Sequence, residues 1–213
     1  MGGMIYWLYE QLLLRQLTTL PNQICFFITA RDMADAPEKL MDCTIWCREI
    51  SEAVKAHDPR GTDPGITGVM FHINTADPHR IEPCLPYIRK LASIARLTLH
   101  LGDTREQLGS GLHVTVAIGK SGRQEIIDCI RRMEADGIPP EQVDEHLIES
   151  CLTFPYTPDL VIKTGGDYLT DFLIWQSVYS ELFFSDVNWE YFRKVDFLRA
   201  LRDYQSRIRR FGR

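Results

Sequence analysis

The sequence feature that most constrains the fold is a continuous apolar run, Ile24-Cys-Phe-Phe-Ile28, which follows Pro21 and two polar residues. The run has the length of a strand, and no polar face alternates with its apolar one. Such a strand is typical of a parallel sheet that is covered on both faces. The sequence therefore predicts a sheet with helices packed on its two sides.

Helical patterns and further strand-like runs alternate along the rest of the chain. The expected strands are 24–28, 66–73, 97–101, 112–118, 159–163 and 181–184. The expected helices are 4–17, 37–56, 79–94, 122–136, 140–151, 170–179 and 194–209. This alternation predicts an α/β fold, a single domain over residues 1–213 with a largely parallel six-stranded sheet flanked by helices. The connection 102–111 is too short for a substantial crossover helix.

Composition and charge narrow the classes of protein. The chain of 213 residues is 45% hydrophobic and 25% charged, which is ordinary for a globular protein and excludes a disordered chain. Its net charge of −5 gives no reason to expect nucleic-acid binding. From Arg199 to the C-terminus there are six Arg and one Asp, a side-chain charge of +5, which leaves −10 for residues 1–198. A cationic C-terminal segment, 194–213, thus follows an acidic body.

The cysteines and the N-terminal helix bear on the compartment. The six cysteines have no regular spacing, so we expect buried free thiols in a reducing, cytoplasmic protein; they are Cys25, Cys43, Cys47, Cys84, Cys129 and Cys151. The helix 4–17 is too short and too polar to span a bilayer. Ile5, Leu8 and Leu12, with Tyr9 as a further candidate, form its expected apolar face. Peripheral contact with a membrane stays open, and docking on the protein's own core is favoured.

One strand-to-helix turn has the character of an anion site. A buried strand leads into Lys163 and Thr164, and Gly165 and Gly166 follow. Such turns lie at the carboxyl edge of a parallel sheet, where anionic ligands bind. Two glycines let backbone N–H groups approach a phosphate closely, with Lys163 as a further donor. A plain tight turn with a solvated lysine is the alternative, and the segment alone leaves both open.

An aromatic stretch and an Arg-rich helix complete the chain. The aromatic residues between Phe172 and Phe192 indicate core or a subunit interface. Glu181 stands out among them, because a carboxylate in an apolar run needs a partner. The last helix has an apolar stripe of Leu201, Tyr204 and Ile208. Its basic face is either solvated or a diphosphate-binding arm, since Arg side chains match phosphate geometry.

Taken together, residues 158–213 resemble the cis-prenyltransferase family, which includes undecaprenyl and dehydrodolichyl diphosphate synthases. The segments that carry this resemblance are Asp159-Leu-Val-Ile-Lys-Thr-Gly-Gly166, Phe172-Leu-Ile-Trp-Gln176, Tyr179-Ser-Glu-Leu-Phe-Phe-Ser-Asp186 and Leu201-Arg-Asp-Tyr204 through Arg209-Arg-Phe-Gly212. Upstream, Val116-Ala-Ile-Gly-Lys-Ser-Gly-Arg-Gln-Glu-Ile126 is similar to the family's segment ending G-R-x-E-I. Leu101-Gly102-Asp103 resembles its I-G-D.

The first substrate site of the family is altered in this sequence. In catalytic members the first strand ends in D-G-N-R, whose Asp handles the magnesium diphosphate of the allylic substrate. Here Thr29-Ala30-Arg31 stands at that point, so Thr29 replaces the Asp. A neutral hydroxyl cannot replace a carboxylate as a hard ligand of Mg²⁺. Losing one preorganised charge at such a centre costs about 3 kcal/mol, some hundredfold in rate.

The second site and the product tunnel depart from the family pattern as well. Where the family reads R-T-G-G-E-x-R-x-S-N, this chain reads Lys163-Thr-Gly-Gly-Asp-Tyr-Leu-Thr-Asp171. Both arginines are absent, with Lys163 a partial substitute for the first, so the bidentate grip on isopentenyl diphosphate is lost. The N-Y-G-G-R segment reads Gly119-Lys-Ser-Gly-Arg123. The helix that the family has between its I-G-D motif and the following strand is absent from this sequence. The helices expected to form the tunnel for the prenyl chain are short.

This pattern resembles the non-catalytic partner subunit of heteromeric cis-prenyltransferases, the Nogo-B receptor type. In that arrangement an R-x-G tail, here Arg210, Phe211 and Gly212, reaches into the catalytic partner's site. It helps to hold isopentenyl diphosphate and the Mg²⁺ of that site. Lys163, Gly165, Gly166 and Arg123 are the further expected diphosphate-binding residues. The expected interface consists of Trp175, Tyr179, Glu181, Phe183 and Phe184.

The resemblance implies an accessory subunit of a synthase that makes long-chain polyprenyl diphosphate for glycosyl-carrier lipids. Its partner would be a catalytic cis-prenyltransferase, in a heterodimer or heterotetramer, with a homodimer in isolation as an alternative. The chain alone would bind no metal, Glu181 being the one candidate ligand. One rival hypothesis is a divergent but active prenyltransferase that uses Asp32 or Asp35 in place of the lost Asp. Another is a protein that binds a prenyl diphosphate without chemistry.

Overall fold

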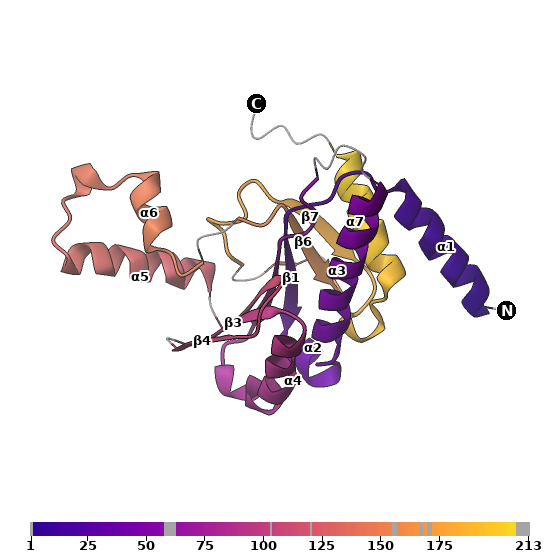
Figure 1. The fold of residues 1–213 in the computed structure, drawn as a ribbon. Coiled ribbons are helices and arrows are strands. Elements are labelled where there is room, and N and C mark those ends of the chain that lie inside the picture. Colours follow the sequence, from indigo (N-terminus) through magenta and orange to yellow (C-terminus); the bar gives the residue numbers. More distant parts are fainter. Residues whose placement is uncertain are drawn as a thin grey trace.

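The computed structural model describes residues 2–57, 63–102, 104–119, 121–154, 157–166, 168–169 and 172–207. Its centre is a sheet of seven strands in the order β4-β3-β5-β2-β1-β6-β7 (Figure 1). The strands are β1 (Gln23–Thr29), β2 (Gly68–Asn74), β3 (Arg96–Leu101), β4 (Thr104–Leu108), β5 (His113–Ile118), β6 (Leu160–Thr164) and β7 (Glu181–Ser185). Only β4, at one edge, pairs in the antiparallel sense. The predicted α/β fold with a largely parallel sheet is confirmed.

Six strands were predicted and the sheet has seven, because the prediction missed β4. The described residues between β3 and β5 contain no helix; the chain turns at Gly102, which has a φ of +56°, and returns along β3 as β4. Its side chains are mostly exposed, and its sequence Thr-Arg-Glu-Gln-Leu lacks the apolar run of a buried strand. An edge strand on a parallel sheet needs no apolar run, so the apolar criterion could not detect it.

Helices and short helical turns connect the strands. They are α1 (Gly2–Gln16), α2 (Ala30–Asp35), α3 (Lys39–His57), η1 (Pro78–Cys84), α4 (Leu85–Lys90), η2 (Leu91–Ser93), α5 (Gly122–Ala135), η3 (Pro140–Gln142), α6 (Glu145–Cys151), η4 (Trp189–Tyr191) and α7 (Lys194–Ser206). The helix expected over 79–94 is thus one α-helical turn between two 3₁₀ pieces, since Pro83 and Pro86 interrupt it. The helix expected over 170–179 was wrong, because residues 174–179 form turns.

The first face of the sheet carries the main core. Phe26, Phe71 and Ile73 point into it and meet the apolar sides of α3, α4 and α7. Phe26 stacks on Phe71 with ring centroids 5.3 Å apart, and the edge of Trp189 packs on both rings. The continuous apolar run of β1 is buried on both sides, as its pattern predicted.

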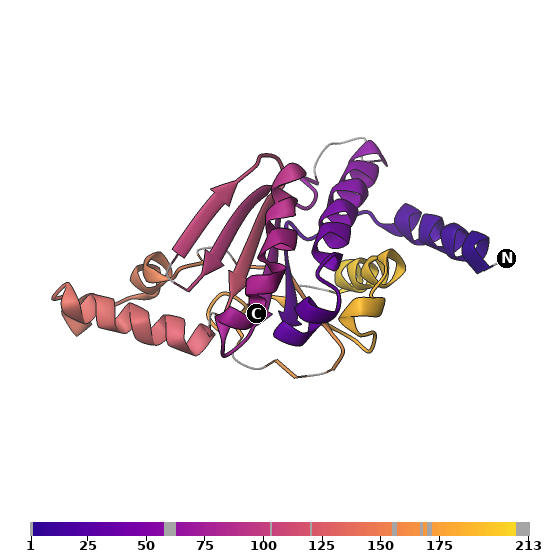
Figure 2. The ribbon, with the colours of Figure 1, turned by 90° about the horizontal axis from the view of Figure 1, so that it is seen from below.

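The second face of the sheet is covered by much less protein. Its apolar cluster contains Cys25, Phe27, Met70, Ala117, Phe154, Val161, Phe172 and Leu173. Next to this cluster lie buried polar side chains, His72, Thr98, His100 and Thr115. The helices α5 and α6 project away from the sheet instead of covering this face (Figures 1 and 2). Loops, not helices, therefore close it.

The N-terminal helix docks on the protein as expected, but through a different side. Leu13 is fully buried, and Tyr9 and Leu14 pack against the core. Ile5, Leu8 and Leu12, the predicted apolar face, are each more than half exposed. None of the helices in the described part of the chain combines the length and apolar character that a membrane span requires.

The six cysteines are free thiols, as predicted. Five are buried and Cys151 is half-buried. Desolvation raises the pKa of the Cys25 thiol to about 12, and burial likewise raises the pKa of Cys43. The Cys25 and Cys43 thiols are therefore uncharged core residues at neutral pH.

Candidate functional site

A row of cavities runs along the carboxyl edge of the sheet, where the parallel strands end. The first, of about 310 Å³, lies at the ends of β1 and β6. The second, of about 500 Å³, lies at the ends of β1, β2 and β5, and shares Thr29 and Arg31 with the first. The third, of about 570 Å³, lies between the sheet and α5, and shares Gly119 and Ser121 with the second. Shared residues make this row one trough, in the place where α/β sheets bind ligands.

Thr29, the last residue of β1, forms a capping box with Asp32 at the start of α2. Its Oγ1 donates to Asp32 Oδ2 at 2.8 Å and accepts the Asp32 N–H at 3.2 Å. The Thr29 N–H donates to the same carboxylate oxygen at 2.8 Å. This arrangement caps α2. The Thr29 hydroxyl and one carboxylate oxygen of Asp32, Oδ2, are therefore hydrogen-bonded to each other at the end of β1.

Lys163 lies at the end of β6 and is buried, with 7% of its surface exposed. Its Nζ donates to the carbonyl of Thr164 and lies 6.0 Å from the ring centre of Phe27. Desolvation lowers the pKa of Lys163, and the nearby charge of Asp32 opposes that shift. The lysine therefore faces the first cavity from the second face of the sheet and is not the solvated lysine of a plain turn.

The two glycines after Lys163 adopt positive φ angles, +63° for Gly165 and +129° for Gly166. A side chain at Gly165 would collide with Asn188, whose Oδ1 would lie 2.7 Å from the new Cβ. The Gly165 N–H donates to the carbonyls of Ser185 and Val187. Gly165 thus serves the tight turn itself, and its N–H is already engaged within the protein.

The middle of the trough is cationic. Arg31 and Arg80 line the second cavity together with the polar residues Thr29, Asn74 and Ser121. Arg31 also forms a 3.5 Å ion pair with Asp35, and 90% of its side chain is exposed. Two guanidinium groups beside neutral donors are suited to an anionic group such as a diphosphate. The sequence motifs did not single out Arg80, because nothing in its neighbourhood connects it with the end of β1.

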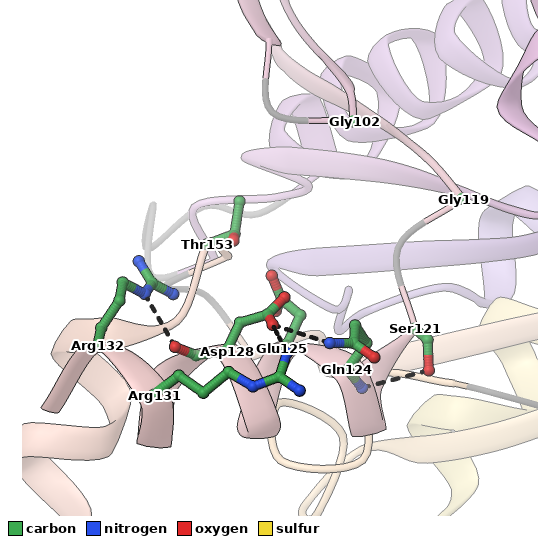
Figure 3. A pocket seen from close by; sticks show the side chains of 9 residues that line it. All are labelled: Gly102, Gly119, Ser121, Gln124, Glu125, Asp128, Arg131, Arg132 and Thr153. Atoms are coloured by element: carbon green, nitrogen blue, oxygen red, sulfur yellow. Dashed lines mark hydrogen bonds and ion pairs between the residues drawn. The ribbon is translucent and has the colours of Figure 1, made fainter. Parts of the chain in front are cut away.

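The third cavity is lined mainly by α5 and is shown in Figure 3. Glu125 is buried there; its Oε2 accepts a hydrogen bond from Gln176 at 3.0 Å, and its Oε1 has no hydrogen-bond partner among the described residues. Asp128 is held by Gln124 at 2.8 Å and by Arg131 at 3.4 Å. The Glu125–Gln176 hydrogen bond connects the G-R-x-E-I segment with the F-L-x-W-Q segment, two motifs that are far apart in the sequence.

The remaining predicted residues lie apart from one another. Arg123 is exposed in the first turn of α5, beside the trough. Glu181 begins β7, at the opposite edge of the sheet from the trough, where Arg207 binds its carboxylate at 3.0 Å. Tyr179 and Phe184 are 57% and 41% exposed, and Trp175 and Phe183 are half-buried. Arg210, Phe211, Gly212 and Ile208 lie outside the described residues.

A Mg²⁺ ion needs several hard oxygen ligands around one point. Among the described residues, no group of three or more His, Cys, Asp or Glu side chains lies close enough together to hold a metal. Asp32 is bound to Thr29, and Asp35 is paired with Arg31. The oxygen ligands present here do not fit a complete Mg²⁺ site of this chain.

Comparison with known proteins identifies the family. A model for putative undecaprenyl diphosphate synthases matches residues 90–212, and an isoprenyl transferase of Thermus thermophilus is 33% identical over 253 aligned positions, which cover 98% of this chain and 96% of the relative. A (2Z,6E)-farnesyl diphosphate synthase of Mycolicibacterium smegmatis is 46% identical over 155 positions, 62% of this chain and 59% of that protein. The chain belongs to the cis-prenyltransferase family, as the motifs predicted.

Solved structures agree on the fold. The chain is similar to lavandulyl diphosphate synthase from Lavandula x intermedia, with a TM-score of 0.65 and 18% identity over 91% of this chain and 99% of that one. A probable undecaprenyl diphosphate synthase from Campylobacter jejuni matches with the same score over 92% and 100%. The alignment with the Thermus relative, at 253 positions, is longer than this chain, so parts of the relative have no counterpart here.

Proposed function

We propose that this cis-prenyltransferase-family chain is the accessory subunit of a heteromeric enzyme that makes long-chain polyprenyl diphosphate for glycosyl-carrier lipids. A catalytic homologue would perform the condensation of allylic and isopentenyl diphosphates with Mg²⁺. This chain would supply its tail, Arg210, Phe211 and Gly212, to the partner's isopentenyl diphosphate site. The observation that carries the proposal is the neutral Thr29 at the end of β1, with its hydroxyl hydrogen-bonded to Asp32.

The end of β1 supports this role because it carries the neutral Thr29 at the position where the family has an Asp. A Mg²⁺-bound diphosphate needs hard anionic oxygens at this point. Thr29 is neutral, and the carboxylate of Asp32 receives two hydrogen bonds from Thr29 itself. The trough keeps Arg31, Arg80 and Lys163, so it retains groups that suit binding an anion more than groups that suit holding its metal.

The second face of the sheet supports a subunit interface. Exposed apolar side chains follow Leu173 of its small cluster in the chain, and one more lies on β7 in register with Lys163. We call these residues, Ile174, Val178, Tyr179 and Phe184, the second-face surface. Clustered exposed aliphatic and aromatic side chains are typical of an interface. Trp175, half-buried in the same segment, belongs to the same predicted contact, whereas Phe183 packs against the main core on the first face.

The test is an assay of isopentenyl diphosphate incorporation with an allylic diphosphate and Mg²⁺. The purified chain is assayed alone, and then with a catalytic homologue from the same genome. We expect incorporation by the pair above that of the homologue alone, and none by this chain. Product formed by this chain alone contradicts the accessory role, and binding of diphosphates without turnover in either case supports a plain binding protein.

The tail is tested in the same pair. Deleting residues 210–213 should leave complex formation intact and lower turnover by about two orders of magnitude, because two charge-assisted hydrogen bonds are worth roughly 1.5–3 kcal/mol each. Arg48→Gln, at an exposed arginine of α3, is the control that removes a positive charge elsewhere. Full turnover by the truncated subunit rules out a tail that acts in trans.

A second candidate is a divergent enzyme that is active alone. Asp32 and Asp35 both line the first cavity, and the relatives named above are called synthases and transferases. If either residue replaces the lost Asp, then Asp32→Asn or Asp35→Asn should abolish product formation by the isolated chain. Under our proposal there is no such activity to abolish, and Thr29→Asp alone creates none, because catalytic groups that act as a unit do not recover singly.

A further inference from the structure

Two of the six cysteines face each other between α5 and α6. The Cys151 thiol donates a hydrogen bond to the carbonyl of Cys129 at 3.6 Å. The Cys129 thiol donates to the carbonyl of Ile148, one helical turn before Cys151, at 3.8 Å. Each thiol thus points at the helix that carries the other. Both cysteines lie in the described part of the chain and outside the lining of the trough, so binding of a diphosphate there does not account for them.

The two thiols differ in their access to solvent. Cys129 is buried, with 1% of its surface exposed, whereas Cys151 is half-buried at the end of α6. Desolvation raises the pKa of Cys129 to about 11, and contact with the Cys151 thiol adds to the rise. The thiolate is the form of a cysteine that reacts with a disulfide. A reagent in solution therefore meets Cys151 first, and Cys129 lies behind it.

The other four cysteines, all of them described, do not combine a neighbouring thiol with access to solvent. Cys43 and Cys47 are one turn apart on α3, but both are fully buried. Cys25 is fully buried in the cluster on the second face. Cys84 is buried as well, and its thiol donates to the carbonyl of Met33 at 3.4 Å. The pair between α5 and α6 is therefore distinct from the cysteines that serve as core residues.

The part of the chain that carries the pair is weakly held by the rest of the protein. The helices α5 and α6 project away from the sheet (Figure 1), and every residue of α6 is exposed or half-buried. Arg132 of α5 holds the end of α6, since its Nη2 donates to the carbonyl of Cys151 at 2.7 Å. A segment with few buried apolar contacts opens locally at a low free energy. A covalent bond between α5 and α6 would therefore constrain a segment that little else constrains.

We propose that Cys129 and Cys151 form a reversible redox site, which a low-molecular-weight disulfide such as oxidised glutathione converts from two thiols to one disulfide. The Cys151 thiolate attacks one sulfur of the glutathione disulfide, so a mixed disulfide forms and one glutathione thiolate leaves. The Cys129 thiolate then attacks the Cys151 sulfur, and the second glutathione thiolate leaves. Solvent carries the two protons lost by the cysteines to the two glutathione thiolates. The cysteine pair is thus oxidised, and the glutathione disulfide is reduced to two thiols.

The disulfide restrains one wall of the third cavity. Cys129 and Cys151 are 22 positions apart, so the bond closes a loop that contains the end of α5 and nearly all of α6. Arg132 and Thr153, which line the third cavity, lie close to the two cysteines in the sequence (Figure 3). A cross-link reduces the conformations open to such a loop, so this wall opens less often in the oxidised chain. The inference does not depend on the accessory role, because neither thiol takes part in it.

The test is incubation of the full chain with oxidised glutathione, followed by mass spectrometry without reduction. We expect the intact mass to fall by two hydrogen atoms, and tryptic peptide 124–131, which contains Cys129, to be linked to peptide 133–163, which contains Cys151. Cys129→Ser should stop at the mixed disulfide and keep one glutathionyl group on Cys151. Cys151→Ser should take up no glutathione, because its Cys129 is buried. Cys47→Ser is the matched control and should form the same linked peptides as the unaltered chain.

Hydrogen exchange measures the consequence in the unaltered chain, so the proposal does not depend on how well a variant folds. The amides of α6 should exchange at least about tenfold more slowly after oxidation, and dithiothreitol should restore the original rate, whereas the amides of β1 should not change. Three results would overturn the proposal. They are a glutathione adduct on the unaltered chain without linked peptides, equal linkage through Cys43, Cys47 or Cys84, and exchange in α6 that oxidation leaves unchanged.

Discussion

The two faces of the sheet differ in how completely this chain covers them. On the first face, α3, α4 and α7 bury Phe26, Phe71 and Trp189 in one continuous core. On the second face, a small cluster around Phe27 is closed by Phe154, Phe172 and Leu173 from loops. Most of the buried apolar residues belong to the first core, whereas the second cluster is small and exposed apolar residues follow it in the chain. The first face therefore stabilises the fold, and the second face is suited to a partner.

The largest expected effect tests the first face. Trp189 is fully buried, and its Nε1 donates to the carbonyl of Ala36 at 3.0 Å. Trp189→Ala should lower the free energy of unfolding by about 3–5 kcal/mol, since it opens a cavity and leaves a buried acceptor without its donor. Urea unfolding measures this change. The control Tyr191→Ala, at a residue 64% exposed, should stay within about 0.5 kcal/mol of the unaltered chain.

The difference between the faces also explains what the sequence could predict about the fold. Core strands such as β1 and β6 contain unbroken apolar runs, Ile24–Ile28 and Leu160–Ile162, and these runs identified them. The strand β4 was missed because its side chains face solvent at an edge. A helix was predicted over 170–179, but the apolar residues of this segment divide between the second cluster and the exposed surface. Local pattern cannot tell these two uses apart.

The next prediction concerns how the second face is held together. A Cβ on Gly122 would lie 2.0 Å from the carbonyl oxygen of Phe172, so the backbones of α5 and this segment touch. Gly122→Ala should force them apart at a cost of about 1–3 kcal/mol in the free energy of unfolding. It should also weaken binding of the catalytic homologue. Gly137→Ala is the control: it meets only the strain of a φ of +69°, with no neighbour within 4 Å, and should leave that binding unchanged.

The candidate site divides in the same way into what sequence could and could not predict. The motifs placed Thr29, Lys163 and Gly165 at one edge, and the structure brings all three to the first cavity. The sequence did not show that the Thr29 hydroxyl is hydrogen-bonded to Asp32, or that Arg80 lines the trough. Those contacts depend on how α2 and η1 pack at the ends of neighbouring strands. Glu181 was linked to the site by its motif, but it lies at the opposite edge.

A third prediction separates folding from association on the second face. Val178 is 64% exposed, so Val178→Asp should change the free energy of unfolding by less than about 0.5 kcal/mol, whereas Phe184→Asp, at a residue only 41% exposed, should lower it by about 1 kcal/mol. Each should weaken the complex with the catalytic homologue at least about tenfold, because a charge would be buried at the contact. Calorimetric titration gives the affinity, with Tyr191→Asp as the control. Unchanged affinity in both variants would place the partner elsewhere.

The smallest expected effect concerns Lys163, which joins the second face to the trough. Its pKa is lowered below 10.5 by desolvation, so between the lowered value and 10.5 the unfolded chain binds more protons than the folded one. The free energy of unfolding should therefore gain a contribution from Lys163 as pH rises through that window. Lys163→Met should remove this contribution, and it should leave the chain more stable than before at neutral pH, where the charged amine is held away from water. Urea unfolding from pH 7 upward, compared with Lys55→Met at an exposed lysine of α3, isolates the effect from other titrating groups. Identical pH profiles for the unaltered chain and Lys163→Met would show that the amine is solvated, and that the end of β6 is the plain turn that its sequence also allowed.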